Sequence, residues 1–318
     1  MSEIIQDKRR KRAALFKKHF LRDWQLYLLI VIPTIPFFIL TYGPMYGIQI
    51  AFRDYRPLGG VTGSVWVGLK WFKDFLADPA FLKIFGNTLI LSLYSLVVSF
   101  PFSIILALLF NAMTSKRYRT VVQTISYMPY FISTTVFVAM IDMLLSPVSG
   151  IYGNLYRLFG GNGYPVDFAA TSAAFRHIYI WSGIWQDVGW GSILYTSALS
   201  AVSMELHEAA KIDGASRFKR VLYVDIPAII PTITIMLIMR VGSIISVGFE
   251  KAYLMQTGLN TKTSEVISTY VYKRGMSSFR NFSYGSAVGL FETLINLTLV
   301  LIVNYLSKKA SDGEVSLF

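Results

Sequence analysis

Long apolar stretches, separated by short polar segments, constrain the fold of this chain more than any other feature. A membrane-spanning helix needs about 20 consecutive, mainly apolar residues. Only 15% of the residues are charged, against about 25% in a typical soluble domain. The sequence therefore predicts an all-α polytopic membrane protein with six transmembrane helices, at residues 25–51, 86–113, 121–145, 176–200, 228–249 and 285–306.

The N-terminal segment has the order of a signal peptide, because the basic stretch KRRKR precedes an apolar run. However, the apolar run from Trp24 to Phe52 is far longer than the roughly 7–15 residues of a signal-peptide core, and no small-residue cleavage site ends it. We therefore expect a retained first transmembrane helix, kinked near its start by Pro33 and Pro36.

The distribution of Lys and Arg predicts the orientation, because cytoplasmic segments carry an excess of positive charge. With the N-terminus inside, the inner segments hold 17 Lys and Arg and the longer outer segments hold 12. The sequence thus predicts a basic cytoplasmic tail at 1–24, a membrane domain at 25–306 and a second cytoplasmic tail at 307–318. The net charge of +12 is then explained by anionic membrane lipid rather than by nucleic acid.

Sequence motifs of catalysis are missing from the chain. No phosphate-binding G-x-x-x-x-G-K-[ST] pattern, no H-E-x-x-H and no G-x-S-x-G occurs. There is no cysteine, and the three histidines have no metal-ligand spacing. We therefore expect a non-catalytic protein without a metal or cofactor.

A charged loop at residues 201–227 separates the fourth and fifth predicted spans, and it is longer than a simple connection requires. Ser203 can cap a short helix, and Gly214 suits the left-handed residue that ends one. A second helical stretch is expected from Phe218, ending at Pro227. The alternative reading from the residues alone is an amphipathic hairpin lying on the lipid surface.

The same loop resembles the cytoplasmic motif of permease subunits in binding-protein-dependent ABC importers, E-A-A-x-x-x-G followed nine residues later by I-x-L-P. This chain has Glu208, Ala209, Ala210 and Gly214, and then Val224, Ile226 and Pro227. The resemblance implies that 201–227 is a cytoplasmic coupling loop whose first helix docks on an ATPase subunit. The residues expected to couple to the ATPase are Glu208, Ala209, Ala210, Asp213, Gly214 and Arg217.

The resemblance extends over nearly the whole chain, through YGPMYGIQIAFRDYRP, WVGLKWF, NTLILS and FEKAYLMQTGLNTKTSEVISTYVY. These stretches are similar to permeases that import complex oligosaccharides and polysaccharide fragments. The resemblance implies a five-helix core plus one extra N-terminal helix, and a pore shared with a second, similar permease, most simply as a heterodimer. It also implies a location in a bacterial inner membrane, two ATP-binding subunits in the cytoplasm and an extracellular solute-binding protein on loops 52–84, 147–176 and 250–284.

Two ionisable residues lie deep in predicted spans, where an isolated charge costs at least about 2.5–3.5 kcal/mol. Asp187 shares a helix face with Gly183 and Gly191, and Arg240 lies in the fifth span. We expect both to face the same water-filled cavity, the alternative being a structural ion pair between Asp187 and Arg240. Asp142 and Glu292 are further intramembrane acids, and we assign them to helix packing.

Sugars require aromatic faces for their C–H surfaces and polar groups for their hydroxyls. In similar sugar permeases the cargo is held by the span before the loop and by the outer end of the span after it. The alternative for the aromatic residues is the interfacial belt of membrane proteins, to which Tyr179 and Trp181 are assigned. The residues expected to bind substrate are Trp185, Gln186, Asp187, Trp190, Phe249, Glu250 and Tyr253.

Two other functions remain as alternatives. An autonomous, ion-coupled secondary transporter usually contains inverted repeats, but none is visible in the sequence, and it leaves the charged loop without a purpose. A membrane enzyme acting on a lipid-linked sugar has no motif in its favour. The sequence does not name the sugar.

Overall fold

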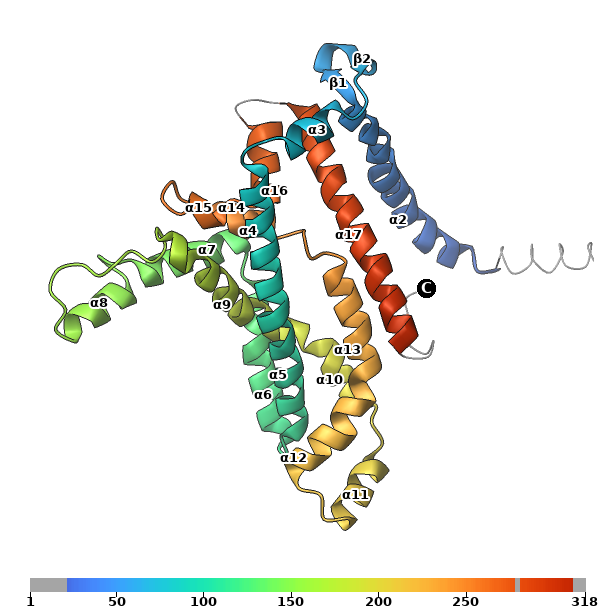
Figure 1. Ribbon diagram of the computed structural model, residues 1–318. Helices are drawn as coiled ribbons and strands as arrows, with labels where there is room; N and C mark the ends of the chain where they lie inside the picture. The colour runs from blue at the N-terminus through green and yellow to red at the C-terminus, as the bar shows by residue number, and fades with distance from the viewer. Residues whose placement is uncertain (1–21, 278–280, 311–318) are drawn as a thin grey trace, which may run out of the picture. The chain divides into compact units, whose positions relative to one another are not determined.

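The computed structural model describes residues 22–277 and 281–310, and these residues divide into two units at Gly68 (Figure 1). Most of the predicted N-terminal tail, and residues 311–318 of the C-terminal one, lie outside the described residues. The first unit consists of α2 (Trp24–Tyr42), η1 (Gly43–Phe52), β1 (Arg53–Arg56), η2 (Pro57–Gly59) and β2 (Gly60–Trp66).

The first unit combines an apolar helix with a small hairpin. α2 and η1 run without a break from Trp24 to Phe52, and none of the residues of α2 is buried within the chain. Strands β1 and β2 pair antiparallel, and Phe52 stacks on Trp66 with a ring separation of 5.6 Å. The helix thus presents apolar side chains all round, as a lipid-exposed span does.

The second unit begins at Leu69, and the regular elements of its described part are all helices. Its elements, in chain order, are α3 (Lys70–Leu76), α4 (Phe81–Tyr94), η3 (Ser95–Ser99), α5 (Phe100–Ala112), α6 (Lys116–Tyr127), η4 (Met128–Phe131), α7 (Thr134–Leu145), α8 (Ile151–Leu158), α9 (Ser172–Gly191), α10 (Ile193–Ser200), α11 (Met204–Ile212), α12 (Arg217–Arg220), η5 (Val221–Asp225), α13 (Ile226–Val241), α14 (Phe249–Leu254), α15 (Thr261–Ser264), α16 (Ile267–Val271), η6 (Tyr272–Met276) and α17 (Phe282–Ala310).

Four helices in the described part of the chain are long and apolar enough to cross a membrane, and a bent helix pair raises the number to five. Three of the four helices, Trp24–Phe52, Phe81–Ala112 and Phe282–Lys309, agree with the predicted spans at 25–51, 86–113 and 285–306. The bent pair is the span predicted at 121–145, and it turns by 99° between Phe131 and Thr134. Pro129 lies in the tight turn η4 just before the bend, where a missing amide donor is tolerated.

The span predicted at 176–200 is helical but less apolar than the others. It forms α9 and α10, which meet at Ser192, and α9 carries Arg176, Gln186 and Asp187. It is not among the apolar spans of the described residues. α9 instead lies inside the bundle, packing against α5, α6 and η4, so its polar residues face other helices rather than lipid.

The span predicted at 228–249 has different ends. α12, η5 and α13 form one helix from Arg217 to Val241, so the prediction that Pro227 ends the preceding helix is wrong. Pro227 lies in the first turn of α13, directly after the π-turn η5, and this wider turn accommodates the proline ring. At the other end, the chain leaves the helix after Val241, and the Ile245 amide donates to Asn296 Oδ1 of α17 at 3.1 Å.

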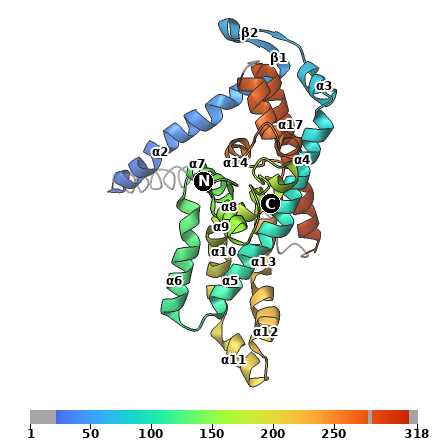
Figure 2. The ribbon, with the colours of Figure 1, turned by 90° about the vertical axis from the view of Figure 1, so that its left-hand side faces the viewer.

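The buried core of the second unit lies where α9 crosses its neighbours. Leu91, Phe175, Ile180 and Val266 are almost fully buried there. α5 packs against α9 and α10, and α13 packs against α10 and α17. α11 and α12 lie together at one end of this unit in both views (Figures 1 and 2).

Candidate transport cavity and charged loop

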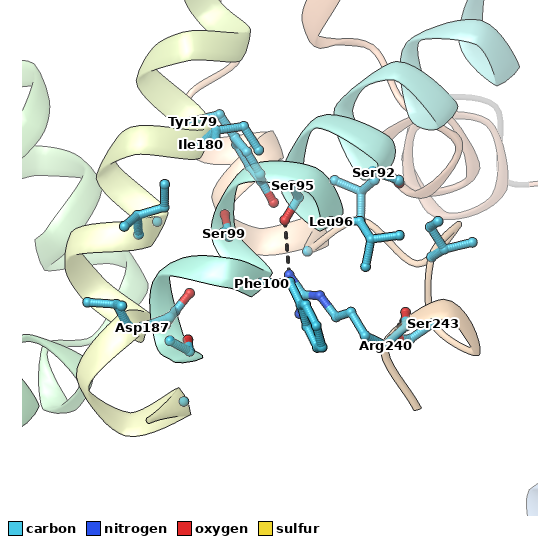
Figure 3. Close-up of a pocket in the computed structure, with 18 of the residues that line it drawn as sticks. Ser92, Ser95, Leu96, Ser99, Phe100, Tyr179, Ile180, Asp187, Arg240 and Ser243 are labelled. Atoms are coloured by element: carbon cyan, nitrogen blue, oxygen red, sulfur yellow. Dashed lines mark hydrogen bonds between the residues drawn. The ribbon is translucent and has the colours of Figure 1, made fainter. Parts of the chain in front are cut away.

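A cavity of about 470 Å³ lies within the second unit, between α4, η3, α5, α9, α13 and the segment that joins α13 to α14 (Figure 3). Its walls carry hydroxyl groups, aromatic rings and three charged side chains. Those that bear on the argument are Ser92, Ser95, Ser99, Ser103, Tyr130, Tyr179, Asp187, Trp190, Arg240, Ser243 and Lys251.

One wall of the cavity is a row of serines. Ser92, Ser95, Ser99 and Ser103 recur every three or four residues along the helix formed by α4, η3 and α5, so all four lie on one face. Arg240 reaches from α13 to this wall and its Nη2 donates to Ser95 Oγ at 3.0 Å (Figure 3). The wall therefore offers several hydroxyl groups to a polar occupant.

Asp187 and Arg240 both line this cavity, but they do not form the direct ion pair considered from the sequence. The hydrogen bond of Arg240 goes to Ser95, and Asp187 projects from α9 on the opposite wall (Figure 3). Both residues line one cavity, as expected, and the alternative of a direct ion pair between them is not present. The physical reason is that the serine wall supplies a nearer acceptor for the guanidinium.

Lys251 is a third charged residue of the cavity, and sequence reasoning missed it. Its Nζ donates to the Tyr179 carbonyl at 3.0 Å and lies 5.1 Å from the Phe137 ring centre and 4.9 Å from that of Tyr179. The charge distribution instead predicts residue 251 in the outer loop 250–284. A lysine directly after an apolar stretch, within the helix-forming sequence FEKAYL, was the available signal.

The predicted substrate residues of α9 divide between the cavity and the helix packing. Asp187 and Trp190 line the cavity, and Trp190 stacks on Tyr130 with a ring separation of 4.6 Å. Gln186 is only 8% exposed and donates to the Ile132 carbonyl at 3.2 Å, so it braces the bend after η4. Trp185 stacks on Phe137 of α7 at 5.6 Å.

The predicted residues of α14 lie outside the cavity lining. Phe249 and Tyr253 stack on each other at 5.4 Å and both contact the ring of Tyr272. Glu250 accepts from Thr135 Oγ1 of α7 at 3.4 Å. The structure therefore separates the predicted set into a cavity group and an aromatic cluster on α14, and both groups keep partly exposed rings.

The charged loop begins with the expected short helix, α11, but its second helical stretch is the start of the long helix Arg217–Val241. Ser203 caps α11 by accepting from the Glu205 amide at 3.2 Å. Gly214 has a φ of +76°, the left-handed conformation expected after the helix end. The apolar side chains of Ile212 and Phe218 stand out at the tip, 87% and 76% exposed. Of the residues expected to couple to the ATPase, only Ala210 is not exposed.

A buried polar contact, not expected from the sequence, ties α11 to α5 and to the long helix Arg217–Val241. Asp225 Oδ1 lies 3.2 Å from His207 Nε2 of α11 and accepts from Asn111 Nδ2 of α5, also at 3.2 Å. Asp225 is 3% exposed. An acid next to an apolar helix start, in the sequence VDIP, was the only signal.

Comparison with known proteins places this architecture in a family. Residues 99–312 match the family described as "Binding-protein-dependent transport system inner membrane component". The chain is 39% identical to protein LplB of Bacillus subtilis, covering 91% of this chain and 90% of LplB. It is also 39% identical to the polygalacturonan/rhamnogalacturonan transport system permease protein YteP of the same organism, covering 98% and 96%.

A solved structure agrees with these relatives. A chain of the bacterial alginate ABC transporter, crystallised with an alginate pentasaccharide-bound periplasmic protein, superposes with a TM-score of 0.83 at 35% sequence identity, covering 94% of this chain and 99% of that one. The fold of this chain is thus shared with that transporter chain, and this chain belongs to the family of inner membrane components of binding-protein-dependent transport systems, as a multi-pass permease subunit.

Proposed function

We propose that this chain is the permease subunit of an ATP-driven importer of oligosaccharides or polysaccharide fragments. The observation that carries the proposal is that the same two helices line the cavity and are linked to α11. The cavity is walled by the helix that ends at Ala112 and the helix that begins at Arg217, and Asn111 and Asp225 tie these two helices to His207 of α11. Motion of the loop is thereby linked to the shape of the cavity.

The lining of the cavity supports a sugar as the cargo. The serine row and Asp187 can form hydrogen bonds with the hydroxyl groups of a sugar. The indole of Trp190, which is 45% exposed, offers a flat face to the C–H surface of a sugar ring. The cavity volume of about 470 Å³ lies within the range of about 300–1,000 Å³ that is typical of small-molecule sites. The named substrates of YteP and of the alginate transporter are polysaccharides, which points in the same direction.

The proposed partners follow from the two ends of the molecule. An ATPase docks on the exposed tip of α11 and α12, where Ile212 and Phe218 provide apolar contacts and Glu208 and Arg217 provide charge. A second, similar permease completes the pore, and a solute-binding protein contacts the outer loops 52–84, 147–176 and 250–284. Hydrolysis of ATP then belongs to the ATPase chains, and this chain is non-catalytic, with both termini in the cytoplasm.

The test is uptake by proteoliposomes that hold the complete complex, with the binding protein outside and ATP inside. Gly214→Val forces a β-branched residue into a positive φ and so displaces the start of α12. We expect lost assembly with the ATPase, or ATP hydrolysis without uptake. Gly289→Ala is the matched control, because its added Cβ meets nothing within 4 Å and its φ is ordinary. Undiminished ATP-driven uptake by Gly214→Val counts against the docking role.

The same proteoliposomes distinguish the importer from the competing function, an autonomous ion-coupled transporter. It predicts uptake that needs an ion gradient, persists without ATP and is indifferent to the ATPase subunits. Uptake of this kind by the chain alone contradicts the importer proposal.

A further inference from the structure

We infer that His207, Asp225 and Asn111 are the positioning residues that make the charged loop and the walls of the cavity move as one body. The inference rests on the proposed function, since it concerns how loop motion reaches the cavity. None of the three belongs to the E-A-A-x-x-x-G motif, and none touches the cavity.

Helix α11 has little else to hold it. None of its residues is buried, and only His207 and Ala210, three residues apart on one face, are partly covered by the rest of the chain. The connection from α11 to α12 is a short turn containing Gly214 at a positive φ. Without an apolar anchor, the orientation of α11 depends on the polar contact that His207 makes.

The partner of His207 is itself fixed from two sides. Asp225 is buried, and its Oδ1 meets both His207 Nε2 and Asn111 Nδ2 at 3.2 Å. The positive charge of Arg220 also acts on it. A buried carboxylate must keep such partners, because an uncompensated buried charge is strongly destabilising. The contact therefore resists separation when α11 is displaced.

The two helices joined here are the same two that Arg240 joins to Ser95 at the cavity. Asn111 and Ser95 lie on the helix Phe81–Ala112, and Asp225 and Arg240 lie on the helix Arg217–Val241. At 1.5 Å rise per residue, the two cross-links are about 23 Å apart along each helix. A displacement of α11 at the lower cross-link thus moves both cavity walls together and is not absorbed by bending within the loop.

The experiment measures uptake per ATP hydrolysed by the complete complex in proteoliposomes, for His207→Ala, Asp225→Ala and the double variant. We expect each single variant to assemble and hydrolyse ATP, while uptake per ATP falls about tenfold, as the loss of one charge-assisted hydrogen bond implies. The double variant should lose no more than the worse single variant, because both remove the same link. Asp23→Asn is the matched control, since it removes a partly exposed carboxylate whose ion pair, with Arg22 at 2.9 Å, lies outside the charged loop and the cavity lining.

A cross-link keeps the test decisive if an alanine variant fails to assemble. The chain contains no cysteine, so H207C/D225C offers a single pair of thiols for a short bifunctional reagent. The inference predicts weak coupling before the reagent is added and recovered coupling afterwards, which a purely structural role does not give. Any of three results overturns the inference. They are unchanged uptake per ATP in assembled alanine variants, additive losses in the double variant, and no recovery of coupling after cross-linking. Wild-type uptake without ATP overturns the proposed function instead.

Discussion

Arg240 donates from α13 to Ser95 in η3 at 3.0 Å, and this bond joins the two long helices that wall the cavity. Ser95 opens the π-turn that continues α4 into α5, and π-turns often occur at functional sites. The bond gives Arg240 a structural role at the cavity wall. Its remaining guanidinium donors are still available to an occupant.

Asp187 is expected to contact the cargo through its carboxylate. Asp187→Asn should lower the rate of uptake at limiting substrate about tenfold or more, because a hydrogen bond to a charged group contributes about 1.5–3 kcal/mol. The measurement is the concentration dependence of uptake in proteoliposomes. Asp142→Asn is the control, since Asp142 is an intramembrane acid outside the cavity lining. Equal effects of the two variants would indicate a general packing role.

Trp190 is expected to provide the aromatic face for the sugar. Trp190→Ala should reduce uptake about tenfold, because it removes both the face and its stacking on Tyr130, while Trp190→Phe should retain most of it. Trp181→Ala serves as control, because Trp181 is similarly exposed at 51% but contacts Phe102 outside the cavity lining. Full uptake by Trp190→Ala, in a stably assembled complex, would remove Trp190 from the site.

Gly189 allows α9 to approach the backbone of α6 closely. A Cβ at Gly189 would overlap the Ser126 carbonyl, so Gly189→Ala should destabilise the protein by about 1–3 kcal/mol. Thermal unfolding in detergent, followed by circular dichroism, measures this loss. Gly289→Ala, whose Cβ meets nothing within 4 Å, should leave the unfolding temperature nearly unchanged. A similar unfolding temperature for both variants would show that α9 and α6 can move apart enough to accommodate the added Cβ.

Asp78 should make the stability of the second unit sensitive to acid. Burial acts to raise its pKa, but hydrogen bonds from Tyr270 and the Ala80 amide, together with the charge of Arg274, outweigh burial and hold the pKa below its ordinary value. A carboxylate with a lowered pKa stabilises the folded state above its ordinary pKa, and this contribution disappears as the pH falls through the lowered value.

Asp78→Asn should therefore destabilise the protein at pH 7 by about 1 kcal/mol, because the neutral amide keeps a hydrogen-bond acceptor but loses the contribution of the charge. The difference from the wild type should shrink as the pH approaches the ordinary pKa of 3.8 and goes below it. Unfolding temperatures in detergent between pH 7 and pH 3 measure the effect, with Asp74→Asn, an exposed acid four residues earlier, for comparison. A constant difference across this range would contradict the argument.

The prediction of the charged loop from the sequence depended on local signals. Ser203 and Gly214 define their ends of α11 through backbone geometry that involves only a few neighbouring residues, and both appear as expected. The prediction that Pro227 ends a helix is wrong, because the π-helical turn before it forms only within the longer helix that continues to Val241.

The sequence by itself determined the membrane class, most of the spans, the turn of the charged loop and the motif that reveals the family. These depend on composition, apolar length and short-range backbone preferences, which each segment carries on its own. Only the tertiary structure decided which side chains meet: Arg240 with Ser95 rather than Asp187, Lys251 with Tyr179, and His207 with Asp225. One residue advances a helix by about 100°, so contacts between helices depend on rotation and register that no single segment specifies.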